Sequence, residues 1–235
     1  MIVQLSQTFY HDISKLSQGE VASFKSRYPD ATYSWWEFRA DVLGALQLHY
    51  GSQNVSEGNK CINCRKEYLL EADVVPCANY RSYQSLSPYT GESYVEGMTF
   101  WTRRELRQVI NYPKQHISNG ARKNEEARGE YKASIRMFKN ARNYLIDKKL
   151  VPDGIAPSYF IEGLLYNVPA QLFGSNRQRT YEGVVGWLLN ANRDGFICQN
   201  GQVALFGSTP EQWNKEDALT MIAAWQVLWN KWGSF

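Results

Sequence analysis

A carboxylate in a strand-like segment is the first residue of this chain that could do chemistry. Asp73 lies in LLEADVVPC among apolar residues, and Glu71 lies on the same face of the predicted strand, about 7 Å away at the usual rise per residue. Burying an acidic side chain costs several kcal/mol unless it is paired, solvated or bound to a metal ion. Asp73 is therefore either a metal ligand or, with Glu71, part of the solvent-exposed face of a one-sided sheet.

Basic residues form the second candidate group. Lys132, Arg136 and Lys139 follow one another at helical spacing in the segment 124–149, which predicts a long amphipathic helix, so they share one face of it. Such a face usually contacts only solvent, but it can also neutralise a polyphosphate. Apolar residues on another face of the same helix predict its buried stripe: Tyr131, Ile135, Phe138 and Leu145.

The third candidate is the sequence APSY at 156–159, which opens a predicted helix over 158–167. The N-terminus of a helix carries free N–H groups and partial positive charge, and both suit a phosphate. Ser158 can donate a hydrogen bond to a phosphate oxygen, and Tyr159 can stack on a base. An ordinary helix start followed by a packed aromatic ring would give the same pattern, so both interpretations stay open.

The elements that must position these residues fall into two parts. Up to about residue 110 the pattern mixes strands and helices, and from 111 helices dominate. The first part predicts strands over 1–5, 59–65, 68–77 and 94–101, a loop over 79–93, and helices over 17–28 and between the capping box Ser34–Glu37 and Gly51. The second part opens with a polar, turn-forming segment, 111–120, that contains His116, and predicts later helices over 181–190 with Thr180 as cap and from Thr209 and Pro210 onward.

Composition and charge exclude several classes of protein. Of the 235 residues 43% are hydrophobic and 21% charged, so the chain can bury a core and is not disordered. Apolar runs stay short of the roughly 18 residues of a membrane span, and the first residues lack a signal-peptide pattern, which favours a cytoplasmic protein without membrane partners. The net charge of +3 is too small to indicate nucleic acid. Cys61 and Cys64 form half of a zinc motif that the scattered histidines do not complete, so reduced structural cysteines are favoured.

Taken in order, these motifs resemble those of the bacterial cGAS/DncV-like nucleotidyltransferases, relatives of 2′-5′-oligoadenylate synthetase in the polymerase-beta-like superfamily. The resemblance implies an α+β fold, in which a mixed-sheet catalytic domain, N-terminally incomplete and covering 1–110, precedes an all-helical nucleotide-binding domain covering 111–235. The segments that carry it are GNKCINC, LEADVVPCANYR, YPKQHISNGARKN, SIRMFKNAR and PSYFIEGLLYNVP.

The resemblance also implies roles for the candidate residues. Members of the family use ATP or GTP with Mg²⁺ (or Mn²⁺) to make cyclic dinucleotide or oligonucleotide second messengers, and the bacterial ones are associated with antiviral defence. Three carboxylates hold the metal ions, and the third corresponds to Asp73. The triphosphate-binding lysine corresponds to Lys139, with Lys132 and Arg136 beside it. The family's Ser-Tyr pair corresponds to Ser158 and Tyr159, for triphosphate contact and base stacking.

One part of the family pattern is absent. The first two metal-binding carboxylates form a D-x-D after a G-S, but no two Asp of this sequence are spaced i, i+2. We therefore expect the chain to start just downstream of that pair, as a fragment, from a mis-assigned start codon, or as a degenerate copy. Losing two of three ligands should lower the rate by about 10³-fold or more, so the chain alone is expected to have little or no synthetase activity.

Two other functions stay open at this point. The chain is alternatively a catalytically dead nucleotide-binding or protein-interaction module, because the residues for the triphosphate are present without the D-x-D. The basic stripe gives weak support to nucleic-acid binding, but a broad basic run is missing. Regulatory protein partners are compatible both with a synthetase and with a catalytically dead nucleotide-binding module.

Overall fold

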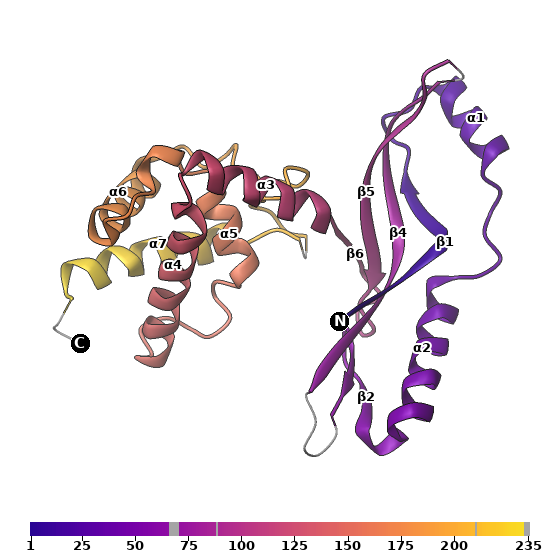
Figure 1. The fold of residues 1–235 in the computed structure, drawn as a ribbon, viewed down its shortest axis with the longest axis horizontal. Coiled ribbons are helices and arrows are strands. Elements are labelled where there is room, and N and C mark those ends of the chain that lie inside the picture. Colours follow the sequence, from indigo (N-terminus) through magenta and orange to yellow (C-terminus); the bar gives the residue numbers. More distant parts are fainter. Residues whose placement is uncertain (66–70, 88, 210, 233–235) are drawn as a thin grey trace. The chain divides into compact units, whose positions relative to one another are not determined.

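The computed structural model describes residues 1–65, 71–87, 89–209 and 211–232. The chain divides into two compact units, Met1–Tyr112 and Pro113–Phe235. Figure 1 shows that the strands belong to the first unit, where two helices accompany them, and that the second unit is helical. The α+β fold class expected from the sequence is confirmed. Among the described residues, every helix is too short or too polar to cross a membrane.

The sheet of the first unit is built around one long strand, β4. It pairs with β5 and β3 in antiparallel fashion and with β1 in parallel, and the order along the sheet is β2-β3-β4-β5-β6 with β1 beside β4. The strands are β1 (Ile2–Asp12), β2 (Val55–Glu57), β3 (Ile62–Cys64), β4 (Ala72–Ser87), β5 (Gly91–Trp101) and β6 (Gln108–Asn111). Residues 68–70, which were expected to open the fourth strand, lie outside the described residues.

The expected loop over 79–93 is wrong, because β4 continues to Ser87 and returns as β5 in a long hairpin. A register shift between Tyr83 and Ser85 interrupts the pairing of the two strands. This irregularity places Tyr83 and Leu86 in one buried cluster although they are three residues apart, whereas residues on one face of an undisturbed strand are two apart. The alternation that marks a strand is therefore hidden in the sequence.

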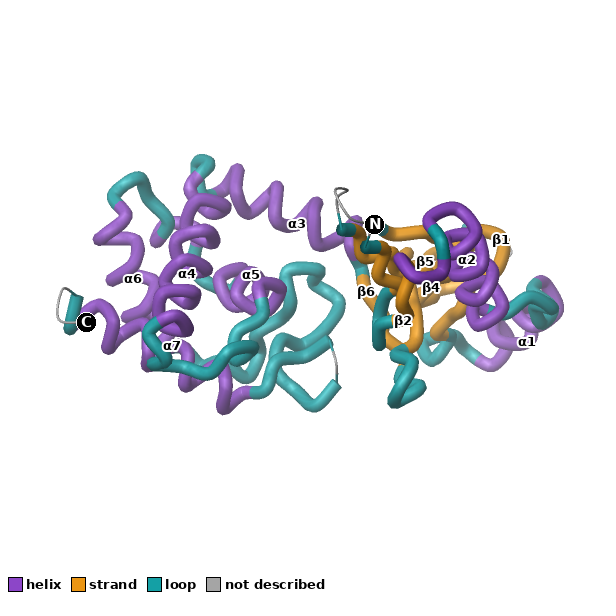
Figure 2. Tube along the Cα trace, turned by 90° about the horizontal axis from the view of Figure 1, so that it is seen from below, coloured by secondary structure: helices purple, strands orange, loops and turns teal. Residues whose placement is uncertain are grey.

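Two helices, α1 (Gln18–Arg27) and α2 (Trp35–Tyr50), cover one face of this sheet, as Figures 1 and 2 both show. The expected start of α2 is confirmed: the Ser34 hydroxyl accepts from the Glu37 amide, and the Glu37 carboxylate accepts from the Ser34 amide at 2.7 Å. Trp35 is fully buried, and its indole donates to the carbonyl of Pro76 in β4 at 2.9 Å. This contact fixes α2 to the central strand. A short 3₁₀ turn, Ser52–Asn54, follows the helix.

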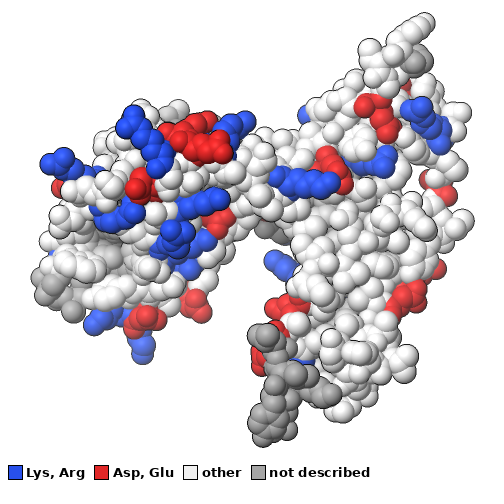
Figure 3. Space-filling model, in the orientation of Figure 1, with Lys and Arg blue, Asp and Glu red and all other residues white. Residues whose placement is uncertain are grey.

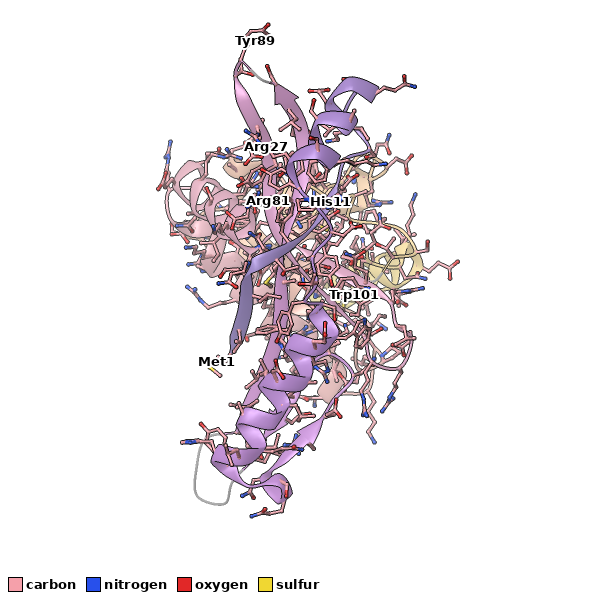
Figure 4. The ribbon with its side chains drawn as sticks, turned by 90° about the vertical axis from the view of Figure 1, so that its right-hand side faces the viewer. Met1, His11, Arg27, Arg81, Tyr89 and Trp101 are labelled. Carbon is pink, nitrogen blue, oxygen red and sulfur yellow. The ribbon has the colours of Figure 1, made fainter. Side chains whose placement is uncertain are left out.

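Figure 4 looks onto this covered face, where β1 and β4 run side by side. His11 of β1 and Arg81 of β4 are register partners. The Arg81 guanidinium lies 4.1 Å from the ring centroid of Phe9 and 4.7 Å from that of Tyr94, and it pairs with Glu92 at 3.8 Å. These contacts tie the hairpin to β1.

The second unit packs its helices around one aromatic core. Phe138 is fully buried, stacked on Tyr181 at 4.9 Å between ring centroids and edge-on to Trp225 at 4.8 Å. The predicted buried stripe of the basic helix is confirmed, since all of its members are buried. The helices are α3 (Pro113–Glu126), α4 (Glu130–Asp147), α5 (Ser158–Tyr166), α6 (Arg177–Asn190) and α7 (Lys215–Asn230), with a 3₁₀ turn at Ala170–Leu172.

The boundaries of four helices differ from expectation. The segment 111–120 is helical from Pro113 onward and is not a turn, because proline suits the first helical position. The expected helix over 124–149 is two helices, separated at Gly129, whose φ of +88° a helix cannot continue through. The helices expected after Thr180 and from Thr209 begin at Arg177 and Lys215, where asparagine caps the first turn. Pro210 lies outside the described residues.

Candidate functional site

Asp73, the predicted metal ligand, lies near the start of β4 and is exposed. Its register partner in β3 is Asn63, whose amide donates to the Asp73 carboxylate at 2.7 Å. Glu71 is also exposed and pairs with Arg65 at 3.6 Å. The Asp73 carboxylate is both hydrogen-bonded and exposed to solvent. It therefore avoids the desolvation cost of a buried acidic side chain.

The donor set around Asp73 fits Mg²⁺ only in part. An exposed carboxylate that accepts one neutral hydrogen bond keeps oxygen lone pairs for a hard cation, and Mg²⁺ in proteins commonly uses one or two carboxylates together with substrate phosphates. Within the described ranges, Asp73 has no group of His, Cys, Asp or Glu around it that could complete a metal site. Asp73 could thus contribute one ligand.

The predicted phosphate-binding lysine belongs to a charged cluster in the helical unit. Lys139 of α4 donates to one carboxylate oxygen of Glu162 in α5, and the ring Nε2 of His116 in α3 lies 2.7 Å from the other oxygen. The three side chains are between 18% and 24% exposed. Burial raises the pKa of Glu162, but the hydrogen bonds and charges of His116 and Lys139 outweigh it and hold this pKa below its usual value. Glu162 is therefore ionised at neutral pH.

Tyr159 adjoins the same cluster. Its ring stacks on that of His116, with the centroids 5.2 Å apart and the planes 18° from parallel. Its hydroxyl accepts from the Asn200 side chain at 2.9 Å, and burial raises the pKa of this hydroxyl. Tyr159 is thus held at both its ring face and its hydroxyl, in the manner of a preorganised stacking platform.

Ser158 begins α5 as expected, and a second cation of α4 lies beside it. Arg142 donates to the main-chain carbonyl of Ala156 at 2.5 Å and lies 3.5 Å from the Ser158 hydroxyl. Because Arg142 follows Lys139 by three residues, both side chains reach α5 from one side of α4. The first turn of α5 therefore has the Arg142 guanidinium beside it, and Lys139 lies one turn further along at Glu162; a cation beside a helix N-terminus favours an anion there.

Lys132 and Arg136, the other two predicted phosphate contacts, do not join this cluster. Both are exposed. Arg136 lines a groove of about 820 Å³ between α4, α6 and α7, together with Tyr144, Trp229 and Trp232. Figure 3 shows basic side chains gathered over α4, with acidic ones beside them.

A buried glutamine ties the helices of the site together. Gln199 is 5% exposed. Its side-chain amide donates to the main-chain carbonyl of His116 at 2.9 Å, and its side-chain oxygen accepts from the Tyr131 hydroxyl at 2.7 Å. Its own main-chain carbonyl accepts from Asn119 at 2.9 Å. A Cβ at Gly120 would lie 2.4 Å from the Gln199 amide nitrogen, so the Asn-Gly pair of α3 serves this packing.

Sequence reasoning gave no role to three residues of the site: Arg142, Glu162 and Gln199. Glu162 stands four residues after Ser158 in the quoted segment PSYFIEGLLYNVP, one helical turn away. That spacing was a usable signal for a partner of the α5 N-terminal residues. Gln199 lies in an irregular segment without a comparable signal.

Comparison with known proteins finds one matching family model and relatives that cover almost the whole chain. The family model of the cGAS/DncV-like nucleotidyltransferase C-terminal helical domain matches residues 118–230. A cyclic UMP-AMP synthase of Rhodothermus marinus (strain SG0.5JP17-172) is 42% identical over 233 residues, which are 99% of this chain and 78% of that protein. Cyclic nucleotide synthase CdnE01 of Staphylococcus haemolyticus is 41% identical over 237 residues, with the same coverage.

A solved structure shares the fold over almost the whole chain. The Rhodothermus marinus CdnE c-UMP-AMP synthase with Apcpp and Upnpp matches with a TM-score of 0.86 and 43% sequence identity, covering 99% of this chain and 77% of that one. The Elizabethkingia meningoseptica CdnE cyclic dinucleotide synthase with GTP and Apcpp matches with a TM-score of 0.67 and 28% identity, covering 89% of this chain and 74% of that one.

Proposed function

The chain belongs to the cGAS/DncV-like nucleotidyltransferases, and from this premise we propose that it binds a nucleoside triphosphate on its helical unit as part of second-messenger synthesis. The relatives are cyclic nucleotide synthases. The observation that carries the proposal is the cluster in which Lys139, Arg142 and Ser158 lie around the start of α5, next to Tyr159. A role in antiviral defence in the cytoplasm is part of the same proposal and rests on the family alone.

Each side chain of the cluster has a distinct task in this proposal. The Lys139 ammonium has three N–H donors. One is used by Glu162, and the others are available for phosphate oxygens. The Ser158 hydroxyl donates to the same phosphate chain, and the Tyr159 ring supports the base. Lys132 and Arg136 contribute only through their charge at a distance, because both are exposed and neither contacts this cluster.

Mg²⁺ (or Mn²⁺) is the cofactor we propose, and Asp73 is the residue that would hold it. When bound, the ion would polarise the attacking hydroxyl and neutralise charge on the phosphates. The side-chain amide of Asn63 donates to the Asp73 carboxylate at 2.7 Å, and this hydrogen bond orients the carboxylate. ATP is the first triphosphate to test, with UTP and GTP beside it, because relatives are a cyclic UMP-AMP synthase and a cyclic dipurine nucleotide synthase.

Binding is tested by calorimetric titration of the chain with a non-hydrolysable ATP analogue, with and without Mg²⁺. Lys139→Met should weaken binding by about tenfold, the equivalent of one charge-assisted hydrogen bond. Lys231→Met is the matched control, because Lys231 is an exposed lysine of the same unit outside the cluster, and it should leave the affinity unchanged. Absence of heat from the wild-type chain at millimolar nucleotide would contradict the proposal.

We further propose that these 235 residues bind nucleotide but turn it over slowly. Asp73 offsets one of the four positive charges of two Mg²⁺ ions, and the sequence has no D-x-D to offset the others. Incubation with radiolabelled ATP, UTP and GTP plus Mg²⁺ should give product at least about 10³-fold more slowly than the Rhodothermus marinus synthase. A comparable rate would contradict this inference. Binding without product would favour the alternative, a nucleotide-binding or protein-interaction module.

A further inference from the structure

Glu162 connects the two halves of the proposed nucleotide site. We propose that it is a positioning residue whose two carboxylate oxygens hold Lys139 for the phosphates and His116 as the support of Tyr159 for the base. The inference rests on the proposed function, since it assumes that a nucleotide binds there. It concerns residues of three different helices, because His116 belongs to α3, Lys139 to α4 and Glu162 to α5.

On the phosphate side, Glu162 fixes a side chain that is otherwise flexible. A free lysine samples many rotamers, and ordering it when a ligand binds costs conformational entropy. The hydrogen bond to Glu162 orders Lys139 before the nucleotide binds. The conformational entropy of this side chain is therefore lost during folding and not during binding. The remaining N–H donors of Lys139 keep a fixed direction.

On the base side, Glu162 fixes the ring of His116. An ionised carboxylate only accepts hydrogen bonds, so the His116 Nε2, 2.7 Å from it, carries the proton. Among the described residues the buried Nδ1 of His116 has no hydrogen-bond partner. The carboxylate therefore fixes the position of Nε2, and in the neutral form of the ring it selects the tautomer with the proton on that nitrogen. The ring is then held parallel to Tyr159, and a base on Tyr159 would extend the stack to three layers.

The charge-conserving substitution Glu162→Asp separates positioning from electrostatics. It keeps the negative charge but shortens the side chain by one methylene group, so the carboxylate cannot reach both Lys139 and His116. We expect the affinity for a non-hydrolysable ATP analogue to fall by about tenfold, which is about 1.4 kcal/mol. Glu182→Asp is the matched control, since Glu182 is an exposed residue of α6, and it should bind like the wild type.

A second measurement reports the position of the groups directly. Nitrogen-15 NMR of His116 in the wild-type chain, recorded at a pH where the imidazole is neutral, should show one protonated and one unprotonated ring nitrogen, with the proton on Nε2. In Glu162→Asp the two tautomers should interconvert. Thermal unfolding of both variants shows whether they fold.

The outcomes decide between the explanations. A folded Glu162→Asp chain with wild-type affinity would overturn the positioning role and leave Glu162 as a structural link between helices. Tighter binding would also overturn it, because Glu162 would then act as a competitor of the phosphates for Lys139. If the wild-type chain binds no triphosphate, the proposed function fails, and an unchanged tautomer ratio in Glu162→Asp would separately refute the hold on His116.

Discussion

Replacing Gly120 with alanine tests whether Gln199 holds the helices of the site together. The new Cβ would lie 2.4 Å from the Gln199 amide nitrogen, whereas ordinary contacts lie at 3.4–4 Å. Gln199 must therefore retreat by about 1 Å, which takes its hydrogen bonds to His116 and Tyr131 beyond hydrogen-bonding distance. Gly120→Ala should thus disturb α3 and α4 together.

The size of the effect follows from burial. Gln199 is 5% exposed, so water cannot replace the lost partners. Each buried polar group left without a partner costs about 1–3 kcal/mol, while alanine in place of glycine inside a helix returns up to about 1 kcal/mol. The expected net loss in unfolding free energy is about 2 kcal/mol, or a fall of about 6 °C in Tm.

Chemical denaturation or calorimetry of Gly120→Ala measures this loss. Gly186→Ala is the control, because Gly186 is also inside a helix but a methyl group added there would meet nothing within 4 Å. It should gain about 0.5–1 kcal/mol. If Gly120→Ala proves as stable as Gly186→Ala, Gln199 does not constrain α3, and the reasoning from its hydrogen bonds is refuted.

Three further predictions concern the core, a helix cap and pH. Phe138→Ala should lower the unfolding free energy by about 3–5 kcal/mol, because it removes a buried ring stacked on Tyr181; a loss below about 1 kcal/mol in a denaturation experiment would contradict the packing. Ser34→Ala should cost about 1 kcal/mol through the loss of the capping box with Glu37, and an unchanged denaturation midpoint would argue against this cap. Because the folded-state pKa of Glu162 is lowered, its contribution to stability is present above its unfolded pKa and is lost as pH falls through the folded one. Between about pH 6 and about pH 3, the wild type should therefore lose more stability than Glu162→Gln, and parallel curves would contradict this.

Local signals in the sequence predicted those elements whose cause is local. The capping box of Ser34 and Glu37 located the start of α2, and the periodicity of Tyr131 and Phe138 identified the buried face of α4. The hairpin of β4 and β5 escaped because a register shift after Tyr83 breaks its alternation. The helical state of 113–126 escaped because its polar residues and Asn-Gly pair favour a turn locally, and contacts with distant residues such as Gln199 decide otherwise.

In the candidate site, too, residues with a local motif were predicted, and contacts between residues far apart in the sequence were not. Asp73, Lys139, Ser158 and Tyr159 were found through their motifs, and their roles stay predictions. The partner of Lys139 could not be deduced, since Glu162 lies 23 residues further along the chain and meets it only through the packing of α4 against α5. Helical spacing alone also could not tell that Arg136 faces a groove away from the cluster.

A structure of the chain with a non-hydrolysable ATP analogue and Mg²⁺ tests the central claim most directly. We predict phosphate oxygens within hydrogen-bonding distance of the Lys139 ammonium and the Ser158 hydroxyl, and the base parallel to the ring of Tyr159. A nucleotide bound elsewhere, for example in the groove lined by Arg136 and Trp229, with Lys139 still engaged only by Glu162, would contradict it.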